Sequence, residues 1–283
     1  MSRPSEPVRV DERMLRGWPL PPPGDSKNAR GRIVVVGGSE RSPGAVMLAG
    51  LAALRVGAGR LTLVTPGAIR LQVAVAVPEA GVLALEGRAS ALLTDSVREE
   101  LSTADAVLVG PGIAEAELAR RLVDEVRDAA GEGTGLVLDA FALGVLPELY
   151  DPLFPRQTVL TPNSEEAGIL LGRDVDIAEA VTLIAARYRV VASCYGEVAA
   201  PHDGGRWHVD AGGPGLGTSG SGDVLAGAIA GLLARGADAA QAAVWATHLH
   251  AAAGDRLSER IAPVGYLARE LCAELPHVLA AIG

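Results

Sequence analysis

A glycine-rich stretch from Gly212 to Gly227 carries the residues most able to do chemistry. It reads G-G-P-G-L-G-T-S-G-S-G-D-V-L-A-G and contains one acid, Asp223. An apolar run follows, so residues 218–223 are predicted to open a helix whose first backbone N–H groups lack intrahelical acceptors. Phosphate oxygens could approach these groups, and Asp223 could accept a proton from an attacking hydroxyl. The stretch predicts a phosphate site with a catalytic base, although an acid there can also simply stabilise the helix.

Two other nucleotide-binding patterns fit this stretch less well. Gly215, Gly217 and Gly220 form a G-x-G-x-x-G, but a dinucleotide fingerprint directly follows a strand and has an acid about 20 residues further on. Here a polar segment precedes the glycines, and Asp238 lies between two expected helices. A Walker loop ending in G-K-[ST] is excluded, because Lys27 is the only lysine among 25 basic residues.

The composition indicates an α/β protein and argues against two classes of partner. Of the 283 residues 49% are hydrophobic but only 3% aromatic, which suits helices packed closely on a parallel sheet. The net charge of −9 argues against nucleic acid or an anionic membrane as partner, since either needs a basic patch. We expect Cys194 and Cys272 to be buried free thiols in a reducing cytosol. The chain shows no long apolar run, which favours a cytoplasmic location.

Short apolar runs alternate with helical patterns along the chain. The expected strands lie at 32–38, 60–65, 106–110, 135–140, 158–161 and 189–193. The expected helices lie at 43–57, 67–77, 89–101, 114–130, 163–171, 176–187, 221–235, 238–255 and 264–282. This order predicts a mostly parallel central sheet with helices on both faces. A single domain is expected over 32–283, after a proline-rich extended arm over 1–31.

Unusual residues follow several of the expected strands. They are Gly37-Gly38-Ser39, Gly110-Pro111-Gly112, Asp139 and Thr161-Pro162-Asn163. Open parallel sheets bind ligands at the carboxyl ends of their strands. We therefore expect a composite site at this edge of the sheet.

The motifs, taken in order, resemble the NAD(P)H-hydrate dehydratases of the ribokinase-like superfamily. The resemblance rests on G-G-S…P-G-A…G-A-G within 27–59, V-G-P-G-I (109–113), T-P-N-S-E-E-A-G-I-L-L-G (161–172) and G-T-S-G-S-G-D-V-L-A-G (217–227), and runs from about Lys27 to the C-terminus. It implies a ribokinase-like fold and a lyase that uses ADP or ATP, with Mg2+, to phosphorylate the hydroxyl of hydrated NADH or NADPH. Elimination of phosphate then restores the nicotinamide ring.

The resemblance also implies roles for individual residues. Asp223 would be the catalytic base and would contact the substrate. Three further residues, Ala45, Gly112 and Asn163, would contact the hydrated cofactor. The nucleotide would be bound by a strand edge and by the glycine loop, through Ser193, Cys194, Tyr195, Gly196, Glu197, Gly220, Ser221 and Gly222.

Three positions depart from the family pattern. Asn163 stands where the family usually has His, and an amide cannot titrate. Phe141 replaces the second acid of D-A-D-A-L, which removes a polar contact and adds a stacking surface. Ser193 and Glu197 replace the Lys and Thr of K-G-x-x-T, although Tyr195 could stack on adenine. These changes leave open a catalytically impaired relative that only binds nucleotide.

Asn163 to Glu166 reads N-x-x-E, a pattern of small-molecule kinases in the same superfamily, where it helps to hold Mg2+. Glu166 is therefore a candidate metal ligand, and a vitamin-precursor or sugar kinase is the alternative function. The sequence leaves open the choices between ADP and ATP and between NADH and NADPH hydrate. The oligomeric state is also open, because helix 43–57 could pack on the sheet or on another subunit of a homo-oligomer.

The histidines predict no metal site. His248 and His250 lie two residues apart on a helix and so point about 200° apart, and we expect one to be packed and the other exposed. Structural roles are expected for His202, His208 and His277. The charged residues of the helix at 114–130 are expected to form its solvated face, namely Glu115, Glu117, Arg120, Arg121, Asp124, Glu125 and Arg127.

Overall fold

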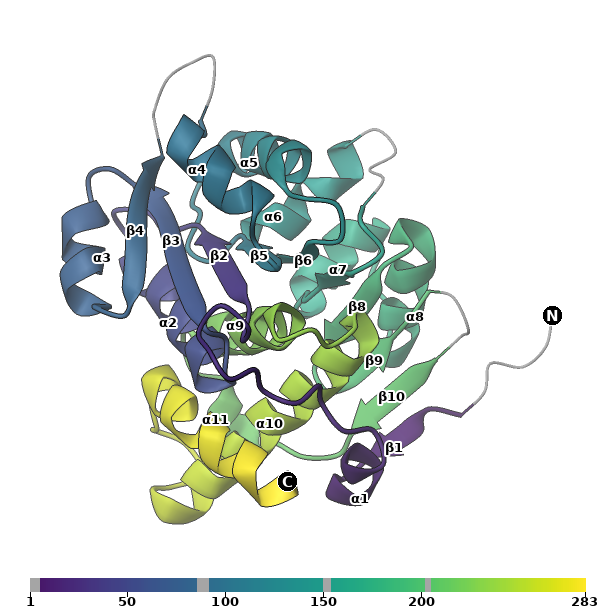
Figure 1. Cartoon of the computed structure of the whole chain (residues 1–283). Helices are drawn as coiled ribbons and strands as arrows, with labels where there is room; N and C mark the ends of the chain where they lie inside the picture. Colours follow the sequence, from purple (N-terminus) through teal and green to yellow (C-terminus); the bar gives the residue numbers. More distant parts are fainter. Residues whose placement is uncertain (1–5, 86–91, 150–153, 202–204) are drawn as a thin grey trace.

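The computed structural model describes residues 6–85, 92–149, 154–201 and 205–283. These residues form a ten-stranded sheet in the order β1-β10-β9-β8-β7-β6-β5-β2-β3-β4 (Figure 1). The strands are β1 (Val8–Val10), β2 (Arg32–Val36), β3 (Arg60–Pro66), β4 (Ala80–Leu85), β5 (Ala106–Val109), β6 (Gly135–Leu138), β7 (Thr158–Leu160), β8 (Val191–Cys194), β9 (Glu197–Ala199) and β10 (Arg206–Val209). Every neighbouring pair is parallel except the two pairs made by β9, which confirms the mostly parallel sheet.

Helices cover both faces of the sheet, as expected (Figure 1). They are α1 (Glu12–Arg16), α2 (Pro43–Arg55), α3 (Arg70–Ala76), α4 (Asp95–Ser102), α5 (Ala116–Ala129), α6 (Phe141–Gly144), α7 (Ser164–Leu171), α8 (Ile177–Tyr188), α9 (Ser221–Ala234), α10 (Ala239–Arg260) and α11 (Ala268–Ile282). Ile33 and Val35 of β2 join a buried cluster with α2, α9, α10 and α11. Val34 and Val36 join a second cluster with α4, α5, α7 and α8, because successive strand residues point to opposite faces.

Helices α2 and α9 pack unusually closely because glycines of α9 face α2. A Cβ atom built on Gly231 would lie 2.7 Å from the Cα of Ala53, and one on Gly227 would collide with the backbone of Ala49. At the far end of α9, a Cβ on Gly31, just before β2, would collide with the carbonyl of Ala234. The C-terminus of α9 therefore lies at the start of β2, and its N-terminus lies at the carboxyl edge of the sheet.

The described residues 6–31 differ from the extended arm expected over 1–31. Strand β1 pairs in parallel with β10, and helix α1 contacts α11. The ring of Trp18 stacks on Trp207 with centroids 5.8 Å apart, and the carbonyl of Trp18 accepts a hydrogen bond of 2.9 Å from Trp245 Nε1. This segment is therefore packed against the edge of the sheet. The sequence does not reveal this packing, because β1 is only three residues long and lies among polar residues.

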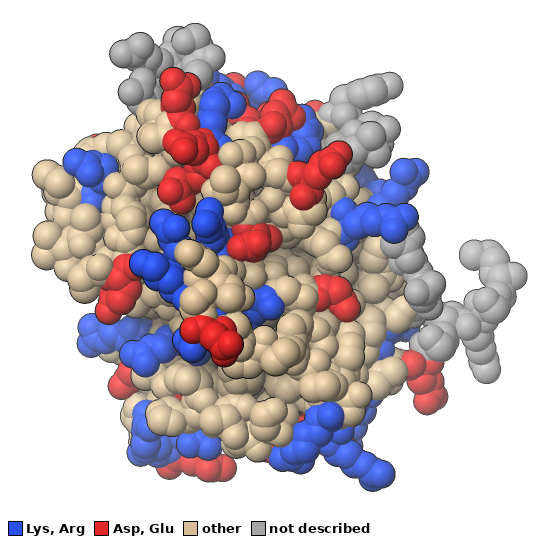
Figure 2. Space-filling view, viewed as in Figure 1, with Lys and Arg blue, Asp and Glu red and all other residues tan. Residues whose placement is uncertain are grey.

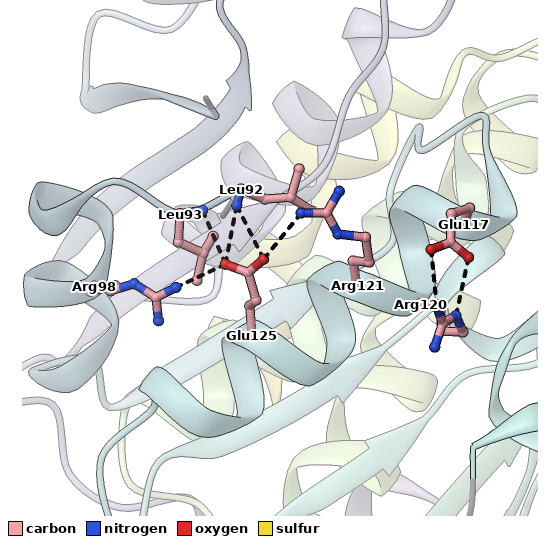
Figure 3. A network of polar contacts seen from close by, with 7 residues as sticks. All are labelled: Leu92, Leu93, Arg98, Glu117, Arg120, Arg121 and Glu125. Carbon is pink, nitrogen blue, oxygen red and sulfur yellow. Dashed lines mark hydrogen bonds and ion pairs between the residues drawn. The ribbon is translucent and has the colours of Figure 1, made fainter. Parts of the chain in front are cut away.

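Glu125 of α5 also departs from the solvated face expected for that helix. Its carboxylate accepts hydrogen bonds from the backbone N–H groups of Leu92 and Leu93 at 3.1–3.2 Å and pairs with Arg98 at 2.9 Å (Figure 3). Its side chain is only 20% exposed. Glu117, in contrast, pairs with an arginine of its own helix at the surface. Glu125 therefore anchors the segment that leads into α4, whereas Glu117 fits the prediction.

The surface and the cysteines follow the sequence more closely. On the face shown in Figure 2, acidic and basic side chains are interspersed. Among the described helices none is long and apolar enough to cross a membrane. Cys194 and Cys272 are buried free thiols, as predicted. Of the remaining sequence predictions, His202 and the start of helix 89–101 (89–91) lie outside the described residues.

Candidate active site

The loops after β2 and β5 lie in direct contact at the carboxyl edge of the sheet. The N–H of Gly38 donates a 2.7 Å hydrogen bond to the carbonyl of Pro111. Gly112 has φ +71°, and a Cβ built on it would lie 3.0 Å from the Cβ of Ala45 and 3.2 Å from the Cα of Gly38. The structure thus brings together Ala45 and Gly112, two of the predicted substrate-binding residues, in a cradle without room for a larger residue at position 112.

Asp139 lies beside this cradle, near enough to the carboxylates of Asp223 and Glu166 for their charges to act on it. Asp139 follows β6, is almost fully buried, and accepts a 2.8 Å hydrogen bond from Thr161 Oγ1. Burial, and then the charges of Asp223 and Glu166, raise the pKa of Asp139 to about 7. Burial raises the pKa of Asp223 to about 6, and it also raises the pKa of Glu166. A base whose pKa lies near neutrality is suited to general base catalysis.

Asp223 lies in the first turn of α9, and its carboxylate takes no part in capping the helix. Within the described residues this carboxylate makes no hydrogen bond. The N-cap residue is Gly220 (φ +89°), so no N-cap side chain bonds the first N–H groups of the helix. The N–H groups of Gly222 and Asp223 have no acceptor there either, whereas the N–H of Ser221 donates to the carbonyl of Thr218 at 3.1 Å. Fewer N–H groups are therefore free to bind an anion than the sequence suggests, because the N–H of Ser221 already has an acceptor.

The β8–β9 hairpin contains the five residues predicted to bind nucleotide at the strand edge. Tyr195 and Gly196 form its two-residue turn, with φ +45° and +88°, and Tyr195 is 68% exposed. Ser193 and Cys194 are buried. Glu197 Oε1 lies 2.7 Å from His208 Nδ1 on β10. Tyr195 therefore presents the free ring surface here, while the two buried side chains point into the protein.

The N-x-x-E pattern forms a helix cap in this structure. Asn163 Oδ1 accepts a 2.9 Å hydrogen bond from the N–H of Glu166, and Glu166 Oε2 accepts one of the same length from the N–H of Asn163. This reciprocal pair is a capping box at the start of α7. Among the described residues no three His, Cys, Asp or Glu side chains are placed to hold a metal ion.

The segment after Asp139 is strained. Ala140 has φ +52° and ψ −130°, a region that residues other than glycine rarely adopt. The next residue, Phe141, is 46% exposed. Strained residues of this kind cluster at functional sites. Their place between Asp139 and α6 agrees with a site at this edge of the sheet.

Two residues of α10 were not found from the sequence as parts of the site. His250 Nε2 lies 2.9 Å from Ser221 Oγ, and Thr247 Oγ1 lies 3.0 Å from Ser193 Oγ. The expectation that one of His248 and His250 is exposed is wrong, because each is only 8% exposed. The sequence did contain a signal for them: they are polar residues on an otherwise alanine-rich helix, and buried polar groups need hydrogen-bond partners.

Comparison with known sequences places the chain among enzymes of one family. A family model described as NAD(P)H-hydrate dehydratase matches residues 33–277. The ADP-dependent (S)-NAD(P)H-hydrate dehydratase of Xanthomonas campestris is 46% identical over 94% of this chain and 93% of that protein. The bifunctional NAD(P)H-hydrate repair enzyme Nnr of Escherichia coli is 32% identical over 96% of this chain but 52% of that protein. The chain thus spans about half the length of this bifunctional relative.

Solved structures give the fold. The ADP/ATP-dependent NAD(P)H-hydrate dehydratase of Bacillus subtilis, co-crystallized with ATP and Mg2+, is 28% identical with a TM-score of 0.84 over 98% of this chain and 99% of that one. An Arabidopsis thaliana ribokinase with ribose and ATP is 14% identical with a TM-score of 0.58 over 88% and 98%, a likeness in fold alone. The doubly covered sheet with its loops at one edge is therefore a ribokinase-like fold. Within this class the chain belongs to the NAD(P)H-hydrate dehydratase family of lyases, as its motifs predicted.

Proposed function

We propose that this chain removes water from hydrated NADH or NADPH in a reaction driven by ADP or ATP. The observation that carries the proposal is a partly buried carboxylate, Asp223, next to two backbone N–H groups without acceptors among the described residues, at a helix N-terminus. A helix N-terminus attracts anions because of its free N–H groups and its dipole. The same turn therefore offers a base for a hydroxyl and donors for a phosphate.

The first step is transfer of a phosphoryl group to the hydroxyl of the hydrate. Asp223 accepts the hydroxyl proton while the oxygen attacks the terminal phosphorus of the nucleotide. The N–H groups of Gly222 and Asp223 stabilise the charge on the transferred group, since donors fixed before the reaction need no reorganisation. With a pKa of about 6, Asp223 is mostly ionised at neutral pH and ready to act as base. In the second step the carbon–oxygen bond breaks, phosphate leaves, and loss of a proton from the neighbouring ring carbon restores the double bond.

Other residues support binding in this proposal. Ala45, Gly112 and Asn163 contact the hydrated cofactor, while the glycine turn and the β8–β9 hairpin bind the nucleotide, with Tyr195 offering a surface for adenine. Mg2+ commonly keeps several waters and binds through one or two carboxylates and substrate phosphates. Glu166 uses one oxygen in its capping box, and among the described residues no three His, Cys, Asp or Glu side chains surround one point, so the protein offers this ion single carboxylate oxygens and no ready cage. The nucleotide phosphates would hold it, and it would neutralise their charge.

The test is recovery of NADH, seen by its near-ultraviolet absorbance, from the hydrate with ADP or ATP and Mg2+. Asp223→Asn keeps the size of the side chain and should lower kcat by about two orders of magnitude, as loss of a general base does. The matched control is Asp128→Asn, at an exposed acid of α5, which should leave kcat unchanged. If wild type restores no NADH with either nucleotide, the proposal fails.

The same assay separates the alternatives. A small-molecule kinase would accumulate a phosphorylated product without restoring NADH. The pattern that suggested a kinase, N-x-x-E, is accounted for by the capping box, so no observation now favours it. A relative that only binds nucleotide would show ADP or ATP binding by calorimetry and no turnover. The cytoplasmic location and a homo-oligomeric state remain predictions.

A further inference from the structure

Two polar side chains interrupt the alanine-rich surface of α10 on one side. Thr247 and His250 are three residues apart, so they lie on the same face of the helix. They are only 4% and 8% exposed. A buried polar group costs free energy unless it is hydrogen-bonded, so the partners of these two side chains define what they can do.

Each partner belongs to a different half of the nucleotide site. Thr247 bonds Ser193 near the end of β8, on the hairpin that ends in Tyr195. His250 bonds Ser221, the first residue of α9, directly before the open N–H groups of the glycine turn. Both serines are also buried, with 1% and 5% exposure. One turn of α10 therefore touches the hairpin and the glycine turn at once.

We propose that Thr247 and His250 are positioning residues that fix the glycine turn relative to the β8–β9 hairpin, so that one nucleotide can bind both. The inference rests on the proposed function, in which these two segments bind the same ADP or ATP. Neither side chain needs to touch the nucleotide. They act through the hydroxyl groups of Ser193 and Ser221.

The physical chemistry of His250 suits a fixed contact. Burial lowers its pKa to about 4, so the ring is neutral throughout the physiological range and adds no charge beside the phosphate site. A neutral ring can hold one geometry with the serine hydroxyl through either tautomer. If this contact is lost, the first turn of α9 can shift, and a displacement of about 1 Å in such a site can cost about a hundredfold in rate.

The test compares two histidines on the same helix. His250→Phe keeps a ring of similar size but removes the bond to Ser221, and should raise the Kd and KM for ADP roughly three- to tenfold, as loss of one hydrogen bond does. His248 is equally buried, but its Nδ1 has no partner among the described residues, and it points away from the site. His248→Phe is therefore the matched control and should leave the KM for ADP unchanged.

Conservative variants distinguish positioning from simple support of the fold. His250→Gln and Thr247→Ser keep a hydrogen-bonding group and should restore most of the ADP affinity that His250→Phe and Thr247→Val lose. Thr247→Val combined with Ser193→Ala should weaken ADP binding by less than the product of the two single effects, because both remove the same bond. If His250→Phe and Thr247→Val lower Tm but keep the wild-type Kd for ADP, the inference is wrong.

The readouts also separate this inference from the proposed function. Calorimetric binding of ADP does not depend on turnover. If wild type binds ADP but restores no NADH, the proposed function fails, and the comparison of Kd values alone decides the role of Thr247 and His250. If wild type binds no nucleotide, both fail.

Discussion

Asp139 offers a direct test of the electrostatics of the site, because its neighbours oppose its ionisation. It is almost fully buried and lies near two other carboxylates. Its pKa rises from 3.8 to about 7 on folding, owing first to burial and then to the charges of Asp223 and Glu166. Asp139→Asn removes the charge, while the amide oxygen can still accept the hydrogen bond from Thr161. The variant therefore isolates the cost of ionising this group.

The sign and size of the effect follow from linkage. A carboxyl whose pKa is higher in the folded protein binds more protons when folded, so its contribution to stability falls as the pH rises from about 4 to about 7. A shift from 3.8 to about 7 corresponds to roughly 4 kcal/mol when the group is ionised in both states. Asn stays neutral at every pH. We expect Asp139→Asn to be more stable than wild type by roughly 4 kcal/mol at pH 8 and by only about 1–2 kcal/mol at pH 5.

Urea unfolding of wild type and variant at pH 5 and pH 8 would measure this difference. Asp128→Asn serves as control, because its exposed side chain should change the free energy of unfolding little at either pH. The reasoning would be refuted by an equal effect of Asp139→Asn at both pH values. A loss of stability at pH 8 would refute it as well, since the ionised carboxylate would then be stabilised by its surroundings.

Three further predictions concern other parts of the molecule. The kcat/KM for the hydrate should fall below about pH 6, because protonated Asp223, with its pKa of about 6, cannot act as base; a flat profile between pH 5 and 8 would contradict that role. Gly227→Val should lower the free energy of unfolding by about 3 kcal/mol or more through overpacking against α2. Gly222→Val should change it by about 1 kcal/mol or less in either direction, because a Cβ there meets nothing within 4 Å and valine is no worse a helix former than glycine; urea unfolding measures both. Glu125→Gln should cost about 1–3 kcal/mol in the same assay, since it weakens charge-assisted bonds to backbone and arginine, and Glu117→Gln at the exposed pair should change little.

The central part of the fold could be predicted from the sequence because its strands are buried on both faces. Runs such as I-V-V-V in β2 are apolar without alternation, which is typical of a parallel sheet covered by helices. The strands at one edge of the sheet were harder to predict. Strands β1, β9 and β10 are three or four residues long and carry polar residues, and their pairing depends on contacts between distant parts of the chain. Propensity and periodicity do not report such contacts.

Some features of the candidate site could likewise be predicted from the sequence, and others could not. Asp223 and the glycine turn could be found because a carboxylate and bare backbone at a helix start are a local pattern. The convergence of Asp139 and Asp223 could not, since it depends on how α9 crosses the sheet. Glu166 shows the opposite case: N-x-x-E has two physical uses, metal binding and helix capping, and the hydrogen bonds of the structure show only the second.

The glycines of α9 serve opposite purposes at its two ends. Gly227 and Gly231 are small because the backbone of α2 lies against them, and this close packing holds the helix at the centre of the sheet. Gly222 is small while nothing packs against it, so the space beside its N–H group is open to a ligand. A helix anchored tightly at its C-terminal half can tolerate an acid with a raised pKa and unpaired N–H groups in its first turn, because its position does not depend on that turn. The packing that holds α9 therefore lies away from its first turn, which leaves that turn open for the phosphate contact that we propose.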